Sequence, residues 1–127
     1  MIQTIWLDKY NGVRYWQFGT QWTWDKFYNR LQEDIDEMAL SDKPIDVILD
    51  FSKTRQLPEH FLTHILIGSK RANENVESIV FLGNPVVHAL MDSFHLLNHD
   101  FLNRYGFADN LEQAMQIIAQ HHPYSLS

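Results

Sequence analysis

Side chains suited to binding a ligand gather in one polar stretch of this 127-residue sequence, directly after a run of apolar residues. The stretch Ser52-Lys53-Thr54-Arg55-Gln56 offers two cations and three neutral hydrogen-bonding side chains. A helical pattern follows from Pro58, and the positive end of a helix dipole at that point favours an anionic group. The stretch therefore predicts a site for an anion or an acidic partner. A solvated loop without a ligand is the alternative that the same composition allows.

Histidines occur at two places with a spacing that metal sites use. His60 and His64 stand one helical turn apart, but Phe61 occupies the position where a metalloprotease motif has glutamate, and no third ligand is recognisable. A second group shares one face of the predicted third helix and consists of His88, Asp92, His95 and His99. A surface metal site or a pH sensor would use such a face, but an exposed polar helix face is the commoner explanation. We predict no metal site and no cofactor.

Motifs for covalent catalysis are absent from the sequence. It contains no cysteine, no Gly-x-Ser-x-Gly elbow, no glycine-rich phosphate loop and no dinucleotide fingerprint. Without cysteine, thiol catalysis, disulfides and thiolate metal ligands are excluded. We therefore predict a binding protein and not an enzyme.

The hydrophobic pattern predicts the elements that position the polar stretch. Residues 45–51 form a short apolar run typical of a strand buried on both faces, and this places residues 52–57 at the carboxyl end of a central strand. Open α/β sheets bind their ligands at that edge. The turns before the first helix and after the next buried strand, residues 78–82, are expected at the same edge. The predicted partner- or ligand-binding residues are Trp22, Thr23, Ser52, Lys53, Thr54, Arg55, Glu59, His60 and Asn84.

Two amphipathic helices are predicted in the first half of the chain. The first follows Thr23 as its N-cap, has Trp22 and Phe27 in hydrophobic-staple positions, and ends near residues 41–44. The second begins with Pro58 at its first position and ends at residues 73–75, with Gly68 allowing a close approach to the sheet.

Two further helices are predicted in the second half. The third begins after the turn Gly83-Asn84-Pro85, in which asparagine serves as the N-cap. A short strand near residues 103–107 comes next. Asp109 and Glu112 then resemble a capping box for the fourth helix.

An aromatic-rich hairpin opens the chain. Residues 3–9 and 13–18 are the predicted strands, and Asn11-Gly12 between them is a strong signal for a two-residue turn. Neighbouring residues of a strand point to opposite faces, so the aromatics cannot all face one core. If helices cover only one face of the sheet, the remainder form an exposed patch and predict a homodimer contact. The aromatics in question are Trp6, Tyr15, Trp16 and Phe18.

Residues 1–127 are predicted to form one α/β domain. The order β-β-α-β-α-β-α-β-α predicts a mixed sheet of four to five strands, in which the opening hairpin is antiparallel and the later strands are parallel. About four helices accompany the sheet. No repeat, linker or low-complexity segment divides the chain.

Three stretches of the sequence resemble a known family. They are Gly19-Thr-Gln-Trp-Thr-Trp-Asp25, Asp46-Val-Ile-Leu-Asp-Phe-Ser52 and Tyr105-Gly-Phe-Ala-Asp-Asn-Leu-Glu-Gln-Ala-Met115. Together with the order of elements, they resemble the STAS superfamily, in particular its stand-alone SpoIIAA-like members, many of which are uncharacterised bacterial proteins. The resemblance implies a small α/β regulatory or protein-interaction module of undefined pathway.

One departure from the family pattern concerns regulation. Phosphorylation-controlled members carry an Asp-Ser-Ser-Gly-like step between the central strand and the next helix, and a partner kinase phosphorylates a serine there. The matching positions here are Pro58-Glu59-His60-Phe61, which lack a hydroxyl group. We therefore predict a module that is not switched by serine phosphorylation at that position. Glu59 is either a fixed mimic of the negative charge or simply a favourable acidic residue at a helix start.

Composition argues against other classes of partner. The net charge of −6 and the lack of a basic stripe disfavour general nucleic-acid binding. No apolar run approaches the roughly 18 residues that span a bilayer, and the first residues lack the pattern of a signal peptide, so we expect a cytoplasmic protein. An alternative function is a small carrier or sensor of an apolar or amphipathic, lipid-like ligand, suggested by the aromatic first helix, the Met-bearing third helix and the basic loop. A hydrolase using a metal at the His60 and His64 pair is the least favoured function.

Overall fold

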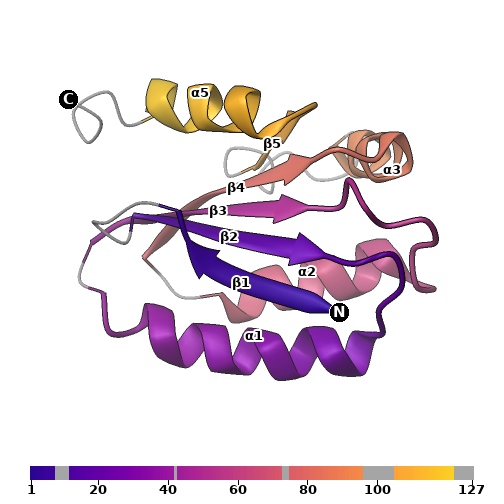
Figure 1. Cartoon of the computed structure of the whole chain (residues 1–127), viewed down its shortest axis with the longest axis horizontal. Coiled ribbons are helices and arrows are strands. Elements are labelled where there is room, and N and C mark those ends of the chain that lie inside the picture. The colour runs from indigo at the N-terminus through magenta and orange to yellow at the C-terminus, as the bar shows by residue number, and fades with distance from the viewer. Residues whose placement is uncertain (8–11, 42, 73–74, 96–104, 122–127) are drawn as a thin grey trace.

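A five-stranded mixed sheet forms the centre of the computed structural model, with helices on both of its faces (Figure 1). The structure describes residues 1–7, 12–41, 43–72, 75–95 and 105–121. The strands are β1 (Ile2–Trp6), β2 (Val13–Phe18), β3 (Ile45–Asp50), β4 (Val76–Leu82) and β5 (Tyr105–Ala108). The helices are α1 (Trp24–Met38), α2 (Phe61–Arg71), α3 (Pro85–His95) and α5 (Leu111–His121).

The sheet has the strand order β1-β2-β3-β4-β5, so every strand lies beside its neighbour in the sequence. β1 and β2 are antiparallel, whereas β2, β3, β4 and β5 are parallel. β3 is hydrogen-bonded on both sides and every one of its residues is buried, as expected for a central strand. The predicted fold class is therefore confirmed. Residues 8–11, which include Asn11 of the predicted two-residue turn, lie outside the described part.

Helices cover both faces of the sheet, which changes the prediction for the hairpin. α1, α2 and α3 share one hydrophobic cluster with the sheet, and α5 packs in a second cluster on the other face (Figure 1). Trp16 and Phe18 belong to the first cluster and are 2% and 0% exposed. The prediction that the hairpin aromatics form an exposed patch was therefore wrong for these two. Trp6 also packs against that cluster.

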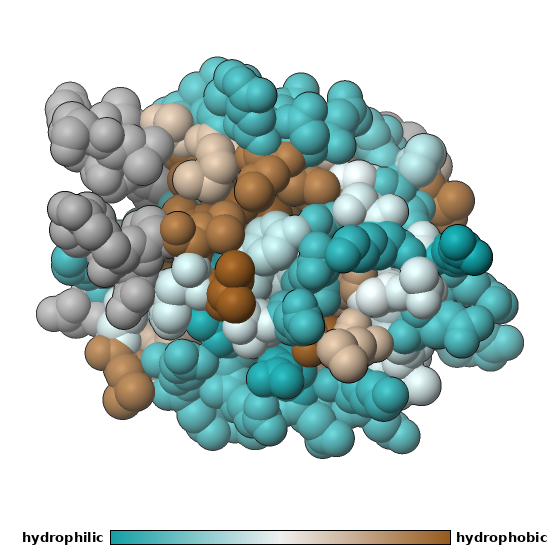
Figure 2. Space-filling view, viewed as in Figure 1, coloured by the Kyte–Doolittle hydropathy of each residue, from teal (hydrophilic) through white to brown (hydrophobic). Residues whose placement is uncertain are grey.

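In the described part of the hairpin, Ile5 is an exposed apolar side chain, at 52% exposure. Figure 2 shows apolar surface beside α5 and over the sheet. Leu7, Tyr15 and Ile117 are the partly buried residues that pack against the second cluster in this region, together with Met115. A homodimer stays a prediction. Because Trp16 and Phe18 are buried, they do not support the aromatic contact that was proposed for it.

α1 begins as predicted and ends earlier than predicted. The Thr23 hydroxyl accepts a hydrogen bond from the Lys26 backbone N–H at 3.3 Å, and Trp22 lies near Phe27 with ring centroids 6.4 Å apart. The N-cap and the hydrophobic staple are thus both present. The helix ends at Met38, because the backbone N–H groups of Leu40 and Ser41 bond three residues back and tighten the chain into a turn.

α2 begins at Phe61, so the prediction of Pro58 as its first residue was wrong. His60 has a left-handed backbone (φ 59°), which is incompatible with continuing the helix backwards to Pro58. Gly68 allows a close approach to α1 and not to the sheet: a Cβ atom there would lie 2.9 Å from the Phe27 ring. The helix ends at Arg71, and residues 73–74 of its predicted end lie outside the described part.

The N-cap of α3 is as predicted, whereas the N-cap of α5 differs from the prediction. The Asn84 Oδ1 atom accepts hydrogen bonds from the backbone N–H groups of Val86 and Val87 at 3.0 and 3.3 Å, as predicted for an N-cap. In α5 the cap is Asn110, whose Oδ1 accepts from the Gln113 N–H at 2.8 Å. The Gln113 side chain reaches back to the Asp109 N–H at 2.6 Å, so the reciprocal pair lies one residue later than predicted.

A buried ion pair fixes α1 on the sheet. Asp34 of α1, which is 1% exposed, accepts hydrogen bonds from Arg14 Nε at 2.6 Å and from Trp16 Nε1 at 2.7 Å, both from β2. Arg14 also donates to Glu37 at 2.7 Å and to Thr4 at 3.0 Å. The pKa of Asp34 is raised by burial, and this effect is opposed by Arg14 and Trp16.

Asp34→Ala should destabilise the protein by about 3 kcal/mol, because it leaves the Arg14 charge and the Trp16 N–H buried without this partner. The matched control is Glu33→Ala on the solvent side of α1, where only an exposed pair with Arg30 at 3.2 Å is lost. That change should cost less than about 1 kcal/mol. Urea unfolding measures both, and equal stability of the two variants would contradict the structural role assigned to Asp34.

Candidate functional site

Three turns meet at the carboxyl edge of the sheet around the side chain of Thr54. Its hydroxyl donates a hydrogen bond to the Gly19 carbonyl at 2.9 Å and accepts one from Trp22 Nε1 at 3.3 Å. Its backbone carbonyl accepts from Asn84 Nδ2 at 3.2 Å. The turns before α1, after β3 and after β4 are therefore adjacent, as the sequence predicted. Thr54 is itself buried, so its role at this edge is structural.

Gly83 brings the turn after β4 directly onto the loop after β3. It has a left-handed backbone (φ 71°), and a Cβ atom at this position would lie 2.7 Å from Ser52 Cβ and 2.8 Å from Ser52 Cα. Only glycine combines this backbone conformation with such a close approach. Ser52 is exposed beyond this contact.

Asp50, the last residue of β3, holds the start of the loop. One carboxylate oxygen accepts a hydrogen bond from the Ser52 N–H at 2.8 Å, and the other accepts one from the Tyr15 hydroxyl. Burial of the ring raises the pKa of Tyr15, and the hydrogen bond and negative charge of Asp50 raise it further. Tyr15 therefore stays protonated in the folded protein at a pH where an exposed tyrosine would ionise.

A groove of about 460 Å³ opens at this edge, between the start of α1 and the loop before α2. Trp24 Nε1 donates to the Glu59 carbonyl at 2.7 Å and so fixes one wall of the groove to α1. Three of the predicted binding residues, Trp22, Thr23 and Glu59, line the groove. The complete lining is Gln21, Trp22, Thr23, Lys26, Gln56, Leu57, Pro58 and Glu59.

The other predicted binding residues lie around the groove. Lys53 and Arg55 are exposed on the same loop, and within the described part of the chain neither side chain forms an ion pair. His60 occupies the left-handed position before α2, and Asn84 lines a different pocket. Lys26 of the lining was missed, although its place one turn after the N-cap Thr23 put it on the same helix end.

In the described part of the chain, the histidines do not belong to any group of three potential metal ligands. His64 stacks on Trp24 with ring centroids 4.4 Å apart, and its Nδ1 is hydrogen-bonded to the Tyr28 hydroxyl at 2.7 Å. His88 stacks on Phe107 and lies 3.4 Å from Asp92. His99 and the side chain of His95 lie outside the described part.

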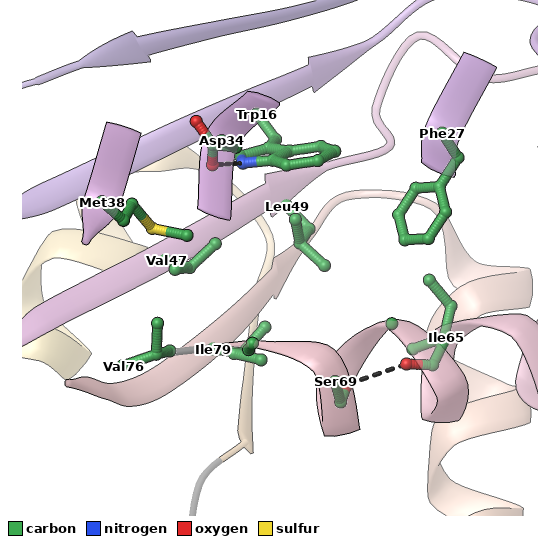
Figure 3. Close-up of a pocket in the computed structure, with 12 residues that line it drawn as sticks. Trp16, Phe27, Asp34, Met38, Val47, Leu49, Ile65, Ser69, Val76 and Ile79 are labelled. Carbon is green, nitrogen blue, oxygen red and sulfur yellow. Dashed lines mark hydrogen bonds between the residues drawn. The ribbon is translucent and has the colours of Figure 1, made fainter. Parts of the chain in front are cut away.

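The interior between the sheet and the α1–α2 layer contains a cavity of about 50 Å³. Figure 3 shows it between Trp16, Met38 and Val47 on one side and Ile65 and Ser69 of α2 on the other. A benzene-sized molecule occupies a cavity of about 150 Å³. This cavity, as the described residues line it, is therefore too small for an acyl chain, and the lipid carrier considered above stays a prediction.

Comparison with protein-family models, with curated proteins and with solved structures found no match for this sequence. The STAS resemblance therefore stays a prediction. No helix in the described ranges has the length and apolar character needed to cross a membrane. The groove is lined by two charged side chains, three neutral polar ones and three apolar ones, a composition that suits binding.

Gly83→Ala should destabilise the protein by about 2 kcal/mol, because the new methyl group meets the Ser52 backbone in a conformation that alanine disfavours. The matched control is Gly106→Ala in β5, where the nearest atom would be 3.4 Å away and little change is expected. Thermal and urea unfolding compare the two variants. Equal stability would show that the turn after β4 does not depend on glycine.

The hydrogen bond from Tyr15 to Asp50 predicts a dependence of stability on alkaline pH. Because the folded-state pKa of Tyr15 is raised, the unfolded chain loses this proton first, and the free energy of unfolding falls as pH rises above about 10. Tyr15→Phe should remove this contribution, which is less than about 1.4 kcal/mol per pH unit because the ring is partly exposed. Urea unfolding of both proteins from about pH 9 to about pH 11 measures the difference. Parallel curves would contradict the prediction.

Proposed function

We propose that the protein is a non-catalytic, STAS-like module that acts in the cytoplasm by binding a protein partner at the carboxyl edge of its sheet. The groove of about 460 Å³ beside the exposed loop is the observation that carries the proposal. Its walls are fixed by hydrogen bonds from Trp22 and Trp24, so little ordering is needed when a partner binds.

The polar groups of the edge favour binding over catalysis. The Thr54 hydroxyl donates to Gly19 and accepts from Trp22, and the Thr23 hydroxyl caps α1. The His64 ring nitrogen Nδ1 is hydrogen-bonded to the Tyr28 hydroxyl. Among the residues that line the groove, no hydroxyl is hydrogen-bonded to a general base, which nucleophilic catalysis requires.

The side chains in and around the groove are better suited to binding a protein surface than to binding a small molecule. The lining alternates amide, hydroxyl and apolar groups with one cation and one anion, Lys26 and Glu59. Lys53 and Arg55 extend the surface with two further exposed cations. Aromatic side chains and arginine are enriched at protein interfaces, whose centres are apolar and whose rims are polar.

Regulation of this module does not use serine phosphorylation at the family position. In the structure Glu59 and His60 precede α2 and lie in the turn before it. Glu59 contributes to the groove, so a fixed carboxylate stands where switched members of the family carry a phosphoacceptor. We infer a constitutive partner surface whose availability does not depend on a kinase acting at this step.

Site-specific photo-cross-linking tests this function. A photoreactive amino acid at position 56 replaces Gln56, which lines the groove, and the matched control replaces Gln32, an exposed glutamine of α1 that bonds Asp36 at 3.3 Å. In cells that naturally produce the protein, the variant at position 56 should form a discrete cross-link to one protein. Equal cross-linking at the two positions, or a measured turnover by the purified protein, would refute the proposal.

A further inference from the structure

The topology creates a second crevice at the carboxyl edge, between β4 and β5. The chain leaves β2, β3 and β4 toward the same face, because α1, α2 and α3 all pack in the first hydrophobic cluster. After β5 it turns to the opposite face, where α5 packs in the second cluster. The turns that follow β4 and β5 therefore diverge, and divergence of adjacent turns opens a crevice beyond the strand ends. Among the described strands, β4 and β5 are the one adjacent pair after which the chain turns toward opposite faces of the sheet.

A pocket of about 290 Å³ lies at this point. Gly83 and Pro85 form its β4 side, and Ala108 and Asp109 form its β5 side. The Gly83 N–H donates to the Ala108 carbonyl at 3.0 Å, which joins the two turns at the base of the crevice. The position expected from topology and the position of the pocket coincide, although neither observation depends on the other.

The side chains of the pocket determine what it would bind. Phe107 is half-buried, and the His88 ring covers it at a centroid distance of 4.5 Å with an angle of 16° between the planes. Asp109 is exposed, and within the described structure its carboxylate has no hydrogen-bond or ion-pair partner. The described lining contains no lysine or arginine.

We propose that this crevice is a binding site for a small organic ammonium ion whose apolar part is about the size of one aromatic ring. The ammonium group would donate to the Asp109 carboxylate, and the apolar body would lie against Phe107, His88 and Pro85. The pocket volume of about 290 Å³ lies just below the range of about 300–1,000 Å³ that small-molecule sites occupy, which limits the ligand to this size. The described lining contains one carboxylate and no lysine or arginine, which disfavours phosphate and carboxylate ligands.

The site is independent of the proposed partner surface and shares no lining residue with the groove. The two are connected through Asn84, which lines the pocket and donates from Nδ2 to the Thr54 carbonyl. Failure of the partner proposal would therefore leave the ammonium site standing, and the reverse is also true.

Two-dimensional amide NMR of the full chain tests the site with a matched set of probes: 2-phenylethylamine, 2-phenylethanol and phenylacetate. The amine at millimolar concentration should shift the amide signals of Gly83, Ala108 and Asp109. The alcohol and the acid should bind at least about tenfold more weakly, since they lack the charge-assisted hydrogen bond.

Asp109→Asn should weaken binding of the amine by about tenfold or more. Asp25→Asn, which changes another exposed aspartate near a helix start, should leave it unchanged. Amine binding that is absent, that is no tighter than phenylacetate binding, or that is equally sensitive to both substitutions would overturn the proposal. Shifts confined to the groove residues would do the same. The comparison of the three probes uses the unaltered protein, so the test does not depend on the stability of a variant.

Discussion

The hydrogen bonds of Thr54 are the constraint on which the carboxyl edge of this sheet depends. One residue joins the turn before α1, the loop after β3 and the turn after β4. Its side chain is buried, so a donor or acceptor left unmade there would cost about 1–3 kcal/mol. The loop is thus held from beneath while its neighbours Lys53, Arg55 and Gln56 stay exposed. Structural and binding roles are divided between adjacent residues of the same loop.

A second constraint acts at the far end of α1. The Arg14–Asp34 pair and the Trp16 N–H set the helix on β2, and this in turn places Trp22, Thr23 and Lys26 at the groove. Burial of charge is costly unless every group is bonded, and here both partners have further hydrogen bonds. Because burial raises the pKa of Asp34, the stability contributed by this carboxyl is greatest below the pKa of the unfolded chain and declines as pH rises through the folded-state pKa. The pair therefore holds α1 at one position on β2.

The fold class and the elements that flank the candidate site were predictable because they follow from patterns that act locally. The apolar run at 45–51 and the N-cap Thr23 predicted β3 and the start of α1. Contacts across the fold were harder to predict. Alternation in the hairpin showed that its aromatics face two ways, but only the packing of α1 reveals that Trp16 and Phe18 point into the core. Likewise, the left-handed backbone of His60 overrides the preference of Pro58 for a helix start.

The site itself was predicted in part for the same reason. Thr54, Trp22 and Asn84 were correctly placed at one edge, because parallel strands bring their carboxyl ends together. The exposure of each side chain depends on packing, which the spacing of residues along the sequence does not determine. For this reason the buried Thr54 was predicted to bind a ligand, and Lys26 was missed. The crevice beside β5 also escaped prediction, since it requires knowing that α5 lies on the opposite face from α3.

Hydrogen exchange by mass spectrometry on a complex purified from cells that naturally make the protein tests the central claim most directly. Amide exchange of the free protein is compared with that of the protein bound to its partner. If the carboxyl edge is the partner surface, protection should be concentrated in residues 19–23 and 52–59. Protection concentrated on α5 or on the outer edge of β1, with those two segments unchanged, would contradict the account.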